Sequence, residues 1–90
     1  MKGRELLVYR VVIPRRVERE IARIDRRYKR RIYAALTVLR SDPFVGKGLE
    51  GERKGQYSYE VWPYRIIYEI EKAKLIVLVI KVGHRQGVYK

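Results

Sequence analysis

The sequence contains no cysteine and only one histidine among its 90 residues. The absence of cysteine excludes disulfide bonds, thiolate zinc sites and cysteine nucleophiles. A single histidine does not favour a metal site built from several imidazoles. Asparagine is absent as well, and a highly charged composition with few thermolabile amides is common in proteins from hot environments. We therefore expect no metal ion and no other cofactor.

Long apolar segments are also lacking. The longest uninterrupted apolar run, Leu75–Ile80, has six residues, whereas a membrane-spanning helix needs about 20. No signal peptide is recognisable, because Arg10 interrupts the apolar stretch near the amino terminus. The composition is nevertheless 47% hydrophobic, which suffices for one modest core. We expect a single domain, residues 1–90, located in the cytoplasm and without membrane association.

Positive charge is the most pronounced feature of the composition. Lys and Arg number 22 and Asp and Glu number 10, so the formal net charge is +12. Residues 1–40 contain 13 basic and 4 acidic side chains and so carry most of this excess. Adaptation to heat would explain abundant charge but not its sign. Because neutralising phosphates releases counterions, the excess favours a nucleic-acid or ribonucleoprotein partner.

The first half of the chain reads as one strand followed by two helices. Leu6–Ile13 is rich in β-branched residues and ends at Pro14, which predicts a strand. Pro14 can open a helix at its first position. This first helix is predicted from apolar residues that recur every three or four positions: Val17, Ile21, Ile24 and Tyr28. A second helix is predicted over Lys29–Arg40, and it ends before Asp42-Pro43.

The second half changes to a period of two. After a glycine-rich loop over residues 46–55, strands are predicted at Gln56–Trp62, Tyr64–Glu71 and Leu75–Val82. In the first of these, Ser58 and Glu60 share one face. The last is apolar on both faces, which indicates a central strand. The predicted fold is α+β with the order β-α-α-β-β-β: an N-terminal strand, a two-helix hairpin over one sheet face and a three-stranded antiparallel meander.

Four short segments carry a more specific pattern. They are Leu49–Gly51 (LEG), Tyr57–Val61 (YSYEV), Tyr64–Tyr68 (YRIIY) and Val82–Tyr89 (VGHRQGVY). Together with the length, charge and element order, they resemble the RelE/ParE superfamily of toxin–antitoxin toxins, and more closely its RelE branch. The resemblance covers nearly the whole chain. It implies either cleavage of mRNA in the ribosomal A site without a metal ion, as in the RelE branch, or inhibition of DNA gyrase, as in the ParE branch.

RNA cleavage without a metal requires removal of the 2′-hydroxyl proton, protonation of the 5′-oxygen and stabilisation of negative charge on the phosphate. The resemblance assigns the last task to Arg65 and Arg85, since arginine binds phosphate bidentately. It assigns Tyr89 to base stacking or proton transfer. His84 is the only side chain with an unperturbed pKa near ~6.5 and is a candidate acid or base. Structural alternatives stay open: Arg65 can pair with a neighbouring glutamate, and Tyr89 can anchor the tail.

Further basic residues are candidates for binding RNA or its phosphates. One group lies on the glycine-rich loop, one residue lies near the C-terminus, and one group lies in the predicted helices, where a solvated face is the simpler interpretation. These candidates are Lys47, Arg53, Lys54, Lys81, Arg26, Arg27 and Arg30.

One departure from the family pattern concerns Ser58 and Glu60. RelE-like nucleases commonly have basic residues at these alternating positions. The carboxylate of Glu60 repels phosphate, although it is also a possible general base. Lys47, Arg53 and Lys54 could replace the missing positive charge.

Three functions follow from these observations. The first is a toxin that acts as a ribosome-dependent mRNA endonuclease and so inhibits translation. The second is a gyrase inhibitor without nuclease chemistry, and the third is a non-catalytic RNA-binding domain of the same fold. The toxin interpretations imply a small acidic antitoxin as partner, in a toxin–antitoxin heterooligomer, in addition to the ribosome and mRNA.

Overall fold

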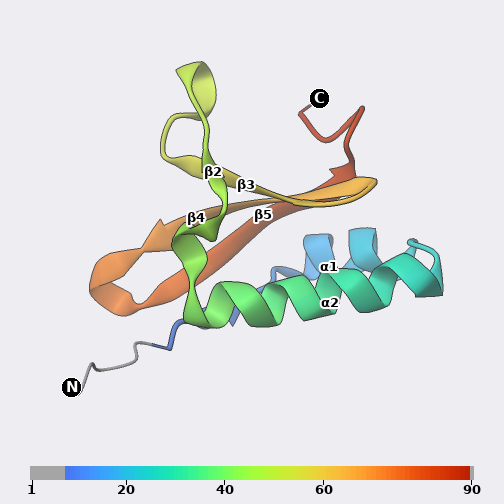
Figure 1. Ribbon diagram of the computed structural model, residues 1–90, viewed down its shortest axis with the longest axis horizontal. Helices are drawn as coiled ribbons and strands as arrows, with labels where there is room; N and C mark the ends of the chain where they lie inside the picture. Colours follow the sequence, from blue (N-terminus) through green and yellow to red (C-terminus); the bar gives the residue numbers. More distant parts are fainter. Residues whose placement is uncertain (1–7, 90) are drawn as a thin grey trace.

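Residues 8–89 are described in a computed structural model of the chain, and they form an α+β fold (Figure 1). Five strands make one sheet in the order β1-β5-β4-β3-β2. Strand β1 is parallel to β5, and the other neighbouring strands are antiparallel. The predicted fold class is confirmed. The strands are β1 Arg10–Val12, β2 Lys47–Gly48, β3 Gln56–Val61, β4 Tyr64–Glu71 and β5 Ile76–His84, and the helices are α1 Arg15–Ala22 and α2 Arg26–Ser41.

The strands differ from the prediction at two places. The first strand is shorter than predicted, with only Arg10–Val12 paired to β5, and positions 6 and 7 lie outside the described residues. Strand β2 was not predicted. It pairs Lys47 with Ser58 and Gly48 with Tyr57 inside the glycine-rich loop. Such a short, glycine-containing segment has no apolar alternation, so the sequence gives no signal for it.

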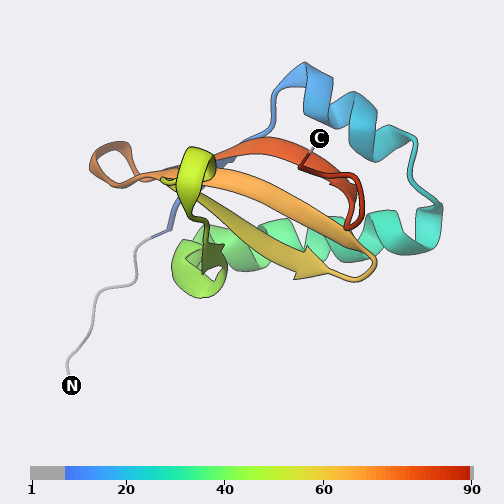
Figure 2. The same cartoon turned by 90° about the horizontal axis from the view of Figure 1, so that it is seen from above.

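Both helices lie on one face of the sheet, as Figures 1 and 2 show. The predicted boundary between them, after Tyr28, was wrong. Helix α1 ends at Ala22, and Asp25 caps α2 by accepting a 2.9 Å hydrogen bond from the Arg27 N–H. The apolar spacing continues across this break because Tyr28 and Ile24 still face the sheet side. No helix within residues 8–89 is both long and apolar enough to cross a membrane.

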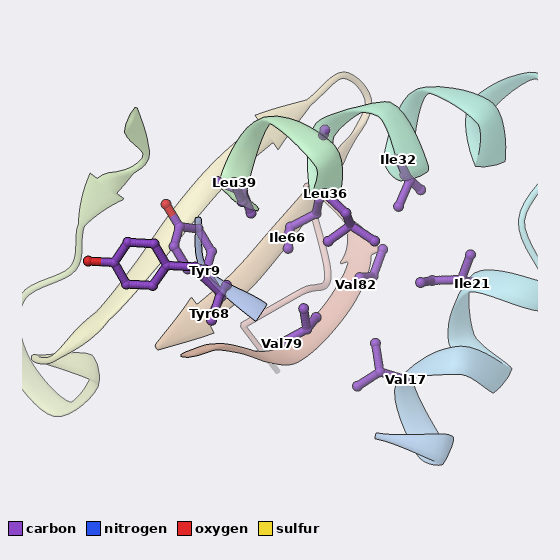
Figure 3. Close-up of a cluster of buried hydrophobic side chains, with 12 residues drawn as sticks. Tyr9, Val17, Ile21, Ile32, Leu36, Leu39, Ile66, Tyr68, Val79 and Val82 are labelled. Carbon is purple, nitrogen blue, oxygen red and sulfur yellow. The ribbon is translucent and has the colours of Figure 1, made fainter. Parts of the chain in front are cut away.

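The hydrophobic core lies between the helices and this face of the sheet (Figure 3). A register shift between β4 and β5 pairs Ile66 with Val82 but Tyr68 with Val79. Val79 and Val82 therefore both face the helices, although they are three positions apart in a strand, where the period is two. The core side chains with the lowest exposure are Val17, Ile21, Ile32, Leu36, Leu39, Ile66, Tyr68, Val77, Val79 and Val82.

Helix α1 also covers the edge of β5 that β1 leaves unpaired. The Arg16 guanidinium donates a 2.9 Å hydrogen bond to the Ile80 carbonyl, and the Glu20 carboxylate accepts a 3.0 Å hydrogen bond from the Val82 N–H. Side chains thus take the place of a neighbouring strand, which protects this edge from pairing with another chain.

Tyr68 connects the sheet to the turn after α2. Its ring is fully buried, and its hydroxyl donates a 2.7 Å hydrogen bond to the Pro43 carbonyl. Burial raises the pKa of Tyr68 to about 12, above the ~10 of a tyrosine in an unfolded chain. A pKa that is raised on folding contributes stability that is complete below the unfolded pKa and is lost as the pH rises through the folded pKa.

We expect the Tyr68→Phe variant to have a free energy of unfolding lower by about 1 kcal/mol near neutral pH, because the buried Pro43 carbonyl loses its donor. Between about pH 10 and pH 12 the wild type should lose stability more steeply than the variant, because only the wild type has this group to ionise on unfolding. Urea unfolding at a series of pH values measures both effects. Parallel pH dependence of the two proteins would contradict the prediction.

The opposite face of the sheet carries the C-terminal segment after β5, which lies on the side away from the helices in Figure 1. Val88 is buried, and it lies so close to Gly83 that a Cβ added there would come within 3.4 Å of it. Ile67, which alternates with the core residues Ile66 and Tyr68, is also fully buried. The segment after β5 is therefore packed back onto the sheet, and it borders the part of this face that stays open.

Candidate active site

A cleft of about 400 Å³ opens on the sheet face that the helices leave uncovered. The loop after α2, strands β3 and β4, and the C-terminal segment each contribute to its walls. Its polar lining contains two cations, Lys47 and Arg65, and one carboxylate, Glu60. The side chains with most bearing on its chemistry are Lys47, Ser58, Glu60, Arg65 and Tyr89.

Strand register places four of these residues in two cross-strand pairs that are two positions apart along β3. Lys47 of β2 is opposite Ser58 of β3, and Glu60 of β3 is opposite Arg65 of β4. Because alternate residues of a strand share a face, Ser58 and Glu60 both point into the cleft, as their alternation predicted. The Arg65 side chain is 29% exposed, so its guanidinium is partly shielded from water but still accessible from the cleft.

Tyr89 is brought to this site by the C-terminal segment. The Arg65 Nη1 donates a 3.4 Å hydrogen bond to the Tyr89 hydroxyl, and the Arg65 guanidinium lies 5.9 Å from the centre of the Tyr89 ring. Arg53 holds the same residue from the loop: its Nη2 donates a 3.1 Å hydrogen bond to the Tyr89 carbonyl, and its guanidinium lies 5.2 Å from the ring centre. Two arginines that are 12 residues apart in the sequence thus meet at one tyrosine.

These contacts change the acidity of Tyr89. Partial burial acts to raise the pKa of its hydroxyl, but the hydrogen bonds with Ser58 and Arg65 and the positive charges of Arg65 and Arg53 lower it, and the net pKa is below the ordinary value. A hydrogen bond or a nearby cation favours the charged phenolate over the neutral phenol. At a given pH, a larger fraction of a tyrosine in this setting is in the phenolate form, which is the form that can accept a proton.

Glu60 is the acidic member of the site. Its Oε1 lies 4.0 Å from the Arg65 Nη2, and its side chain is 49% exposed. An ion pair this long and this exposed contributes little to stability. The structural alternative for Arg65, pairing with a glutamate on the same face, is therefore partly realised, yet the same guanidinium also reaches Tyr89.

Two residues predicted for the site do not line the cleft. The Arg85 guanidinium lies 4.6 Å from the centre of the Trp62 ring, and its backbone N–H donates a 2.8 Å hydrogen bond to the Pro63 carbonyl. The His84 ring is edge-on to Tyr64, with 5.8 Å between ring centres. Since His84 is opposite Tyr64, which packs against the core, the His84 ring lies on the helix side of the sheet, whereas Gly83, opposite Arg65, lies on the cleft side.

The other predicted basic residues are distributed over the surface. Lys54 lines a separate depression on the loop side of β3, and Lys81 is opposite Ile67 in the β4–β5 pair. The remaining three lie on α2, across the sheet from the cleft, and one of them forms a 3.2 Å ion pair with the helix cap Asp25. These three are Arg26, Arg27 and Arg30.

Sequence reasoning missed two participants. Ser58 was treated only as a departure from the family pattern, but it lines the cleft together with Tyr89 and contributes to the lowered pKa of the Tyr89 hydroxyl. Its alternation with Glu60 was the signal that could have identified it. Trp62 was not considered functional, although it is 58% exposed and stacked on Arg85. Within residues 8–89, no group of three or more His, Asp or Glu side chains is placed to hold a metal ion.

Gly46, in the wall of the cleft, lies against the Tyr68 hydroxyl. A Cβ atom on Gly46 would overlap the Tyr68 hydroxyl and lie 3.0 Å from the Ser58 carbonyl oxygen. We expect Gly46→Ala to lower the free energy of unfolding by about 1–3 kcal/mol, the usual cost of overpacking. Chemical denaturation measures this, and Gly48→Ala is the control, because a Cβ there meets only the Tyr57 ring at 4.0 Å. Equal destabilisation by the two changes would contradict the expectation.

Comparison with known proteins gives matches over almost the whole chain. Residues 7–89 match the family described as ParE toxin of type II toxin–antitoxin system, parDE. No curated protein sequence gives a significant match. Among solved structures, the chain is similar to one in the RelBE2 toxin–antitoxin complex of Mycobacterium tuberculosis, with 28% identity, a TM-score of 0.80, and coverage of 87% of this chain and 99% of that one.

Two further structures share the fold at lower identity. The archaeal RelE–RelB complex of Pyrococcus horikoshii has 23% identity and a TM-score of 0.77, with coverage of 89% of this chain and 98% of that one. The isolated Escherichia coli RelE toxin has 22% identity and a TM-score of 0.74, with coverage of 84% and 83% respectively.

Proposed function

This chain belongs to the ParE toxin family of type II toxin–antitoxin systems, within the RelE/ParE superfamily, and on that premise we propose that it is a ribosome-dependent mRNA endonuclease that acts without a metal ion. The observation that carries the proposal is the contact between Arg65 and Tyr89 in an open, partly cationic cleft. A phosphate-binding cation directly beside a tyrosine of lowered pKa is what cleavage by a 2′-hydroxyl requires.

In the proposed reaction, the Tyr89 phenolate removes the proton of the 2′-hydroxyl, whose oxygen then attacks the adjacent phosphorus. The bond from phosphorus to the 5′-oxygen breaks, which leaves a 2′,3′-cyclic phosphate and a 5′-hydroxyl. Arg65 stabilises the additional negative charge on the phosphoryl oxygens, with Lys47 as the second cation of the cleft. His84 is the candidate from the sequence for protonating the departing 5′-oxygen, but its ring lies against Tyr64 on the helix side of the sheet and would have to swing around the end of β5 to reach the cleft. Glu60 is the alternative base, because it also faces the cleft.

We propose that a small acidic antitoxin is the protein partner and that the two form a heterooligomer. Two of the similar structures are RelB–RelE complexes, and the +12 charge of this chain favours an acidic partner. The exposed basic side chains of α2, including Arg26 and Arg30, are far from the cleft across the sheet. They are the surface that we assign to ribosomal RNA or to the antitoxin.

A second candidate function, inhibition of DNA gyrase, is favoured by Ser58 and Glu60. Basic side chains at these positions would have strengthened phosphate binding, whereas Glu60 places a carboxylate 4.0 Å from the Arg65 guanidinium. The match to the ParE family points in the same direction. This function would need the basic surface but no proton transfer by Tyr89.

In vitro translation followed by primer extension on the message separates these functions, together with a supercoiling assay of gyrase. Cleavage that requires ribosomes supports the proposed nuclease. Intact message with arrested supercoiling would assign the protein to gyrase. If neither occurs and RNA is only retained on a filter, the chain is a non-catalytic RNA-binding member of the fold.

A further inference from the structure

Trp62 is the only tryptophan of the chain and one of its most exposed large apolar side chains. It lies in the short turn between β3 and β4, and 58% of its surface is accessible to solvent. Tryptophan and other aromatic side chains are enriched where proteins bind other molecules. The exposure of Trp62 alone does not make it a binding residue, so the side chains around it decide whether it is one.

Arg85 fixes one side of this ring. Its guanidinium lies 4.6 Å from the centre of the indole, a distance at which a cation is attracted to the ring face. The Arg85 backbone is tied to the same turn by its hydrogen bond to the Pro63 carbonyl. No carboxylate within residues 8–89 pairs with Arg85, and its buried Nε has no hydrogen-bond partner there. The guanidinium is thus held in place while its charge is left uncompensated.

The pair of Trp62 and Arg85 lies beyond the end of β3, the strand that carries Ser58 and Glu60 of the candidate active site. Trp62 follows Glu60 by two residues, which corresponds to about 7 Å along an extended strand. Arg85 belongs to the same C-terminal segment as Tyr89, which contacts Arg65. A nucleic-acid strand that enters the cleft at Lys47 and passes Arg65 in the direction of β3 would next reach Trp62, two residues beyond Glu60.

We propose that Trp62 and Arg85 form a stacking platform for one base of a single-stranded RNA, next to the nucleotide whose phosphate meets Arg65. The indole stacks on the base, and the Arg85 guanidinium stabilises the indole and contacts the neighbouring phosphate. The identification of this strand as mRNA rests on the proposed function, whereas the stacking itself does not. The platform would position the strand in the cleft without taking part in proton transfer.

The test uses the fluorescence of Trp62, which reports on this site alone because the chain has no other tryptophan. The probe is a 2′-O-methyl oligoadenylate of about eight nucleotides, within the size range that single-strand-binding modules cover. It cannot be cleaved, because its 2′-oxygens are blocked. A second probe of the same length carries the phosphates but has abasic sites in place of the adenosines. Fluorescence polarisation of an end label measures affinity independently of the tryptophan signal.

We expect the oligoadenylate to quench Trp62 fluorescence to saturation and the abasic probe to leave it nearly unchanged. Trp62→Ala should weaken oligoadenylate binding by about 10- to 100-fold, as stacking contacts of this kind do, while Trp62→Phe keeps most of the affinity. Arg85→Ala should weaken binding more than Arg19→Ala, which removes the same charge from an exposed position on α1. Because Trp62 is exposed, thermal unfolding of its variants should match that of the wild type.

Binding of the oligoadenylate without quenching would overturn the proposal, and so would equal affinity of wild type and Trp62→Ala. Quenching by both probes alike would show charge attraction without stacking, and absence of binding would also reject the platform. If Trp62 responds as expected while translation assays show no cleavage, the nuclease proposal fails and the stacking platform stands.

Discussion

Replacement of Arg65 by alanine is expected to reduce ribosome-dependent mRNA cleavage by about 100- to 1,000-fold, the usual effect of losing one group that stabilises charge in a transition state. Arg65 and Lys47 are the two cations that line the cleft. Only Arg65 also contacts Tyr89, with a 3.4 Å hydrogen bond. Its loss therefore removes both the charge that faces the phosphate and a group that lowers the pKa of Tyr89. Primer extension on a translated message, with rates taken from the first turnovers, measures the loss.

Two further variants make this result specific. Arg65→Lys keeps the charge but loses the planar fork that binds two phosphoryl oxygens at once, so its rate should lie between those of alanine and arginine. Arg19→Ala removes one positive charge from an exposed position on α1 and should leave cleavage within a few-fold of the wild type. If Arg19→Ala and Arg65→Ala were equally impaired, total charge rather than the site would govern activity.

Replacement of Tyr89 by phenylalanine should lower cleavage by about 100-fold or more, the typical contribution of a positioned acid or base. Phenylalanine keeps the ring that Arg53 and Arg65 approach but removes the hydroxyl. The wild-type rate should rise with pH until the Tyr89 phenolate is fully formed, and this rise should be absent in the variant. Tyr33→Phe is the matched control, because Tyr33 is an exposed tyrosine on α2.

The pH profile also tests the cause of the lowered pKa of Tyr89. Arg53→Gln removes a cation that favours the phenolate, so the pKa of Tyr89 should increase and the rising part of the rate profile should move to higher pH. A profile that does not move would show that Tyr89 is not the titrating base. If Glu60→Gln abolished cleavage and Tyr89→Phe did not, the base would be Glu60.

Local sequence patterns were sufficient for most of the fold. The alternation in YRIIYEIE placed Arg65 on one face of β4 and Ile66 on the other, and the structure has this arrangement. Helix α2 and the three long strands were likewise predicted within a few residues. These features depend on the 3.6- and 2-residue periods of helices and strands, and the spacing of apolar residues along the sequence shows both periods. The helix boundary at Asp25 was missed because the apolar spacing runs across it.

The composition and four motifs of the sequence also determined the family and the excess of positive charge, since both are properties of the chain itself. Tertiary structure alone decided which of the candidate residues act together. Arg53 and Arg65 meet at Tyr89 only because the C-terminal segment packs back over the sheet through Val88. The same packing directs Arg85 to Trp62 and away from the cleft. Contacts between such distant positions depend on register and chain direction, which no local periodicity encodes.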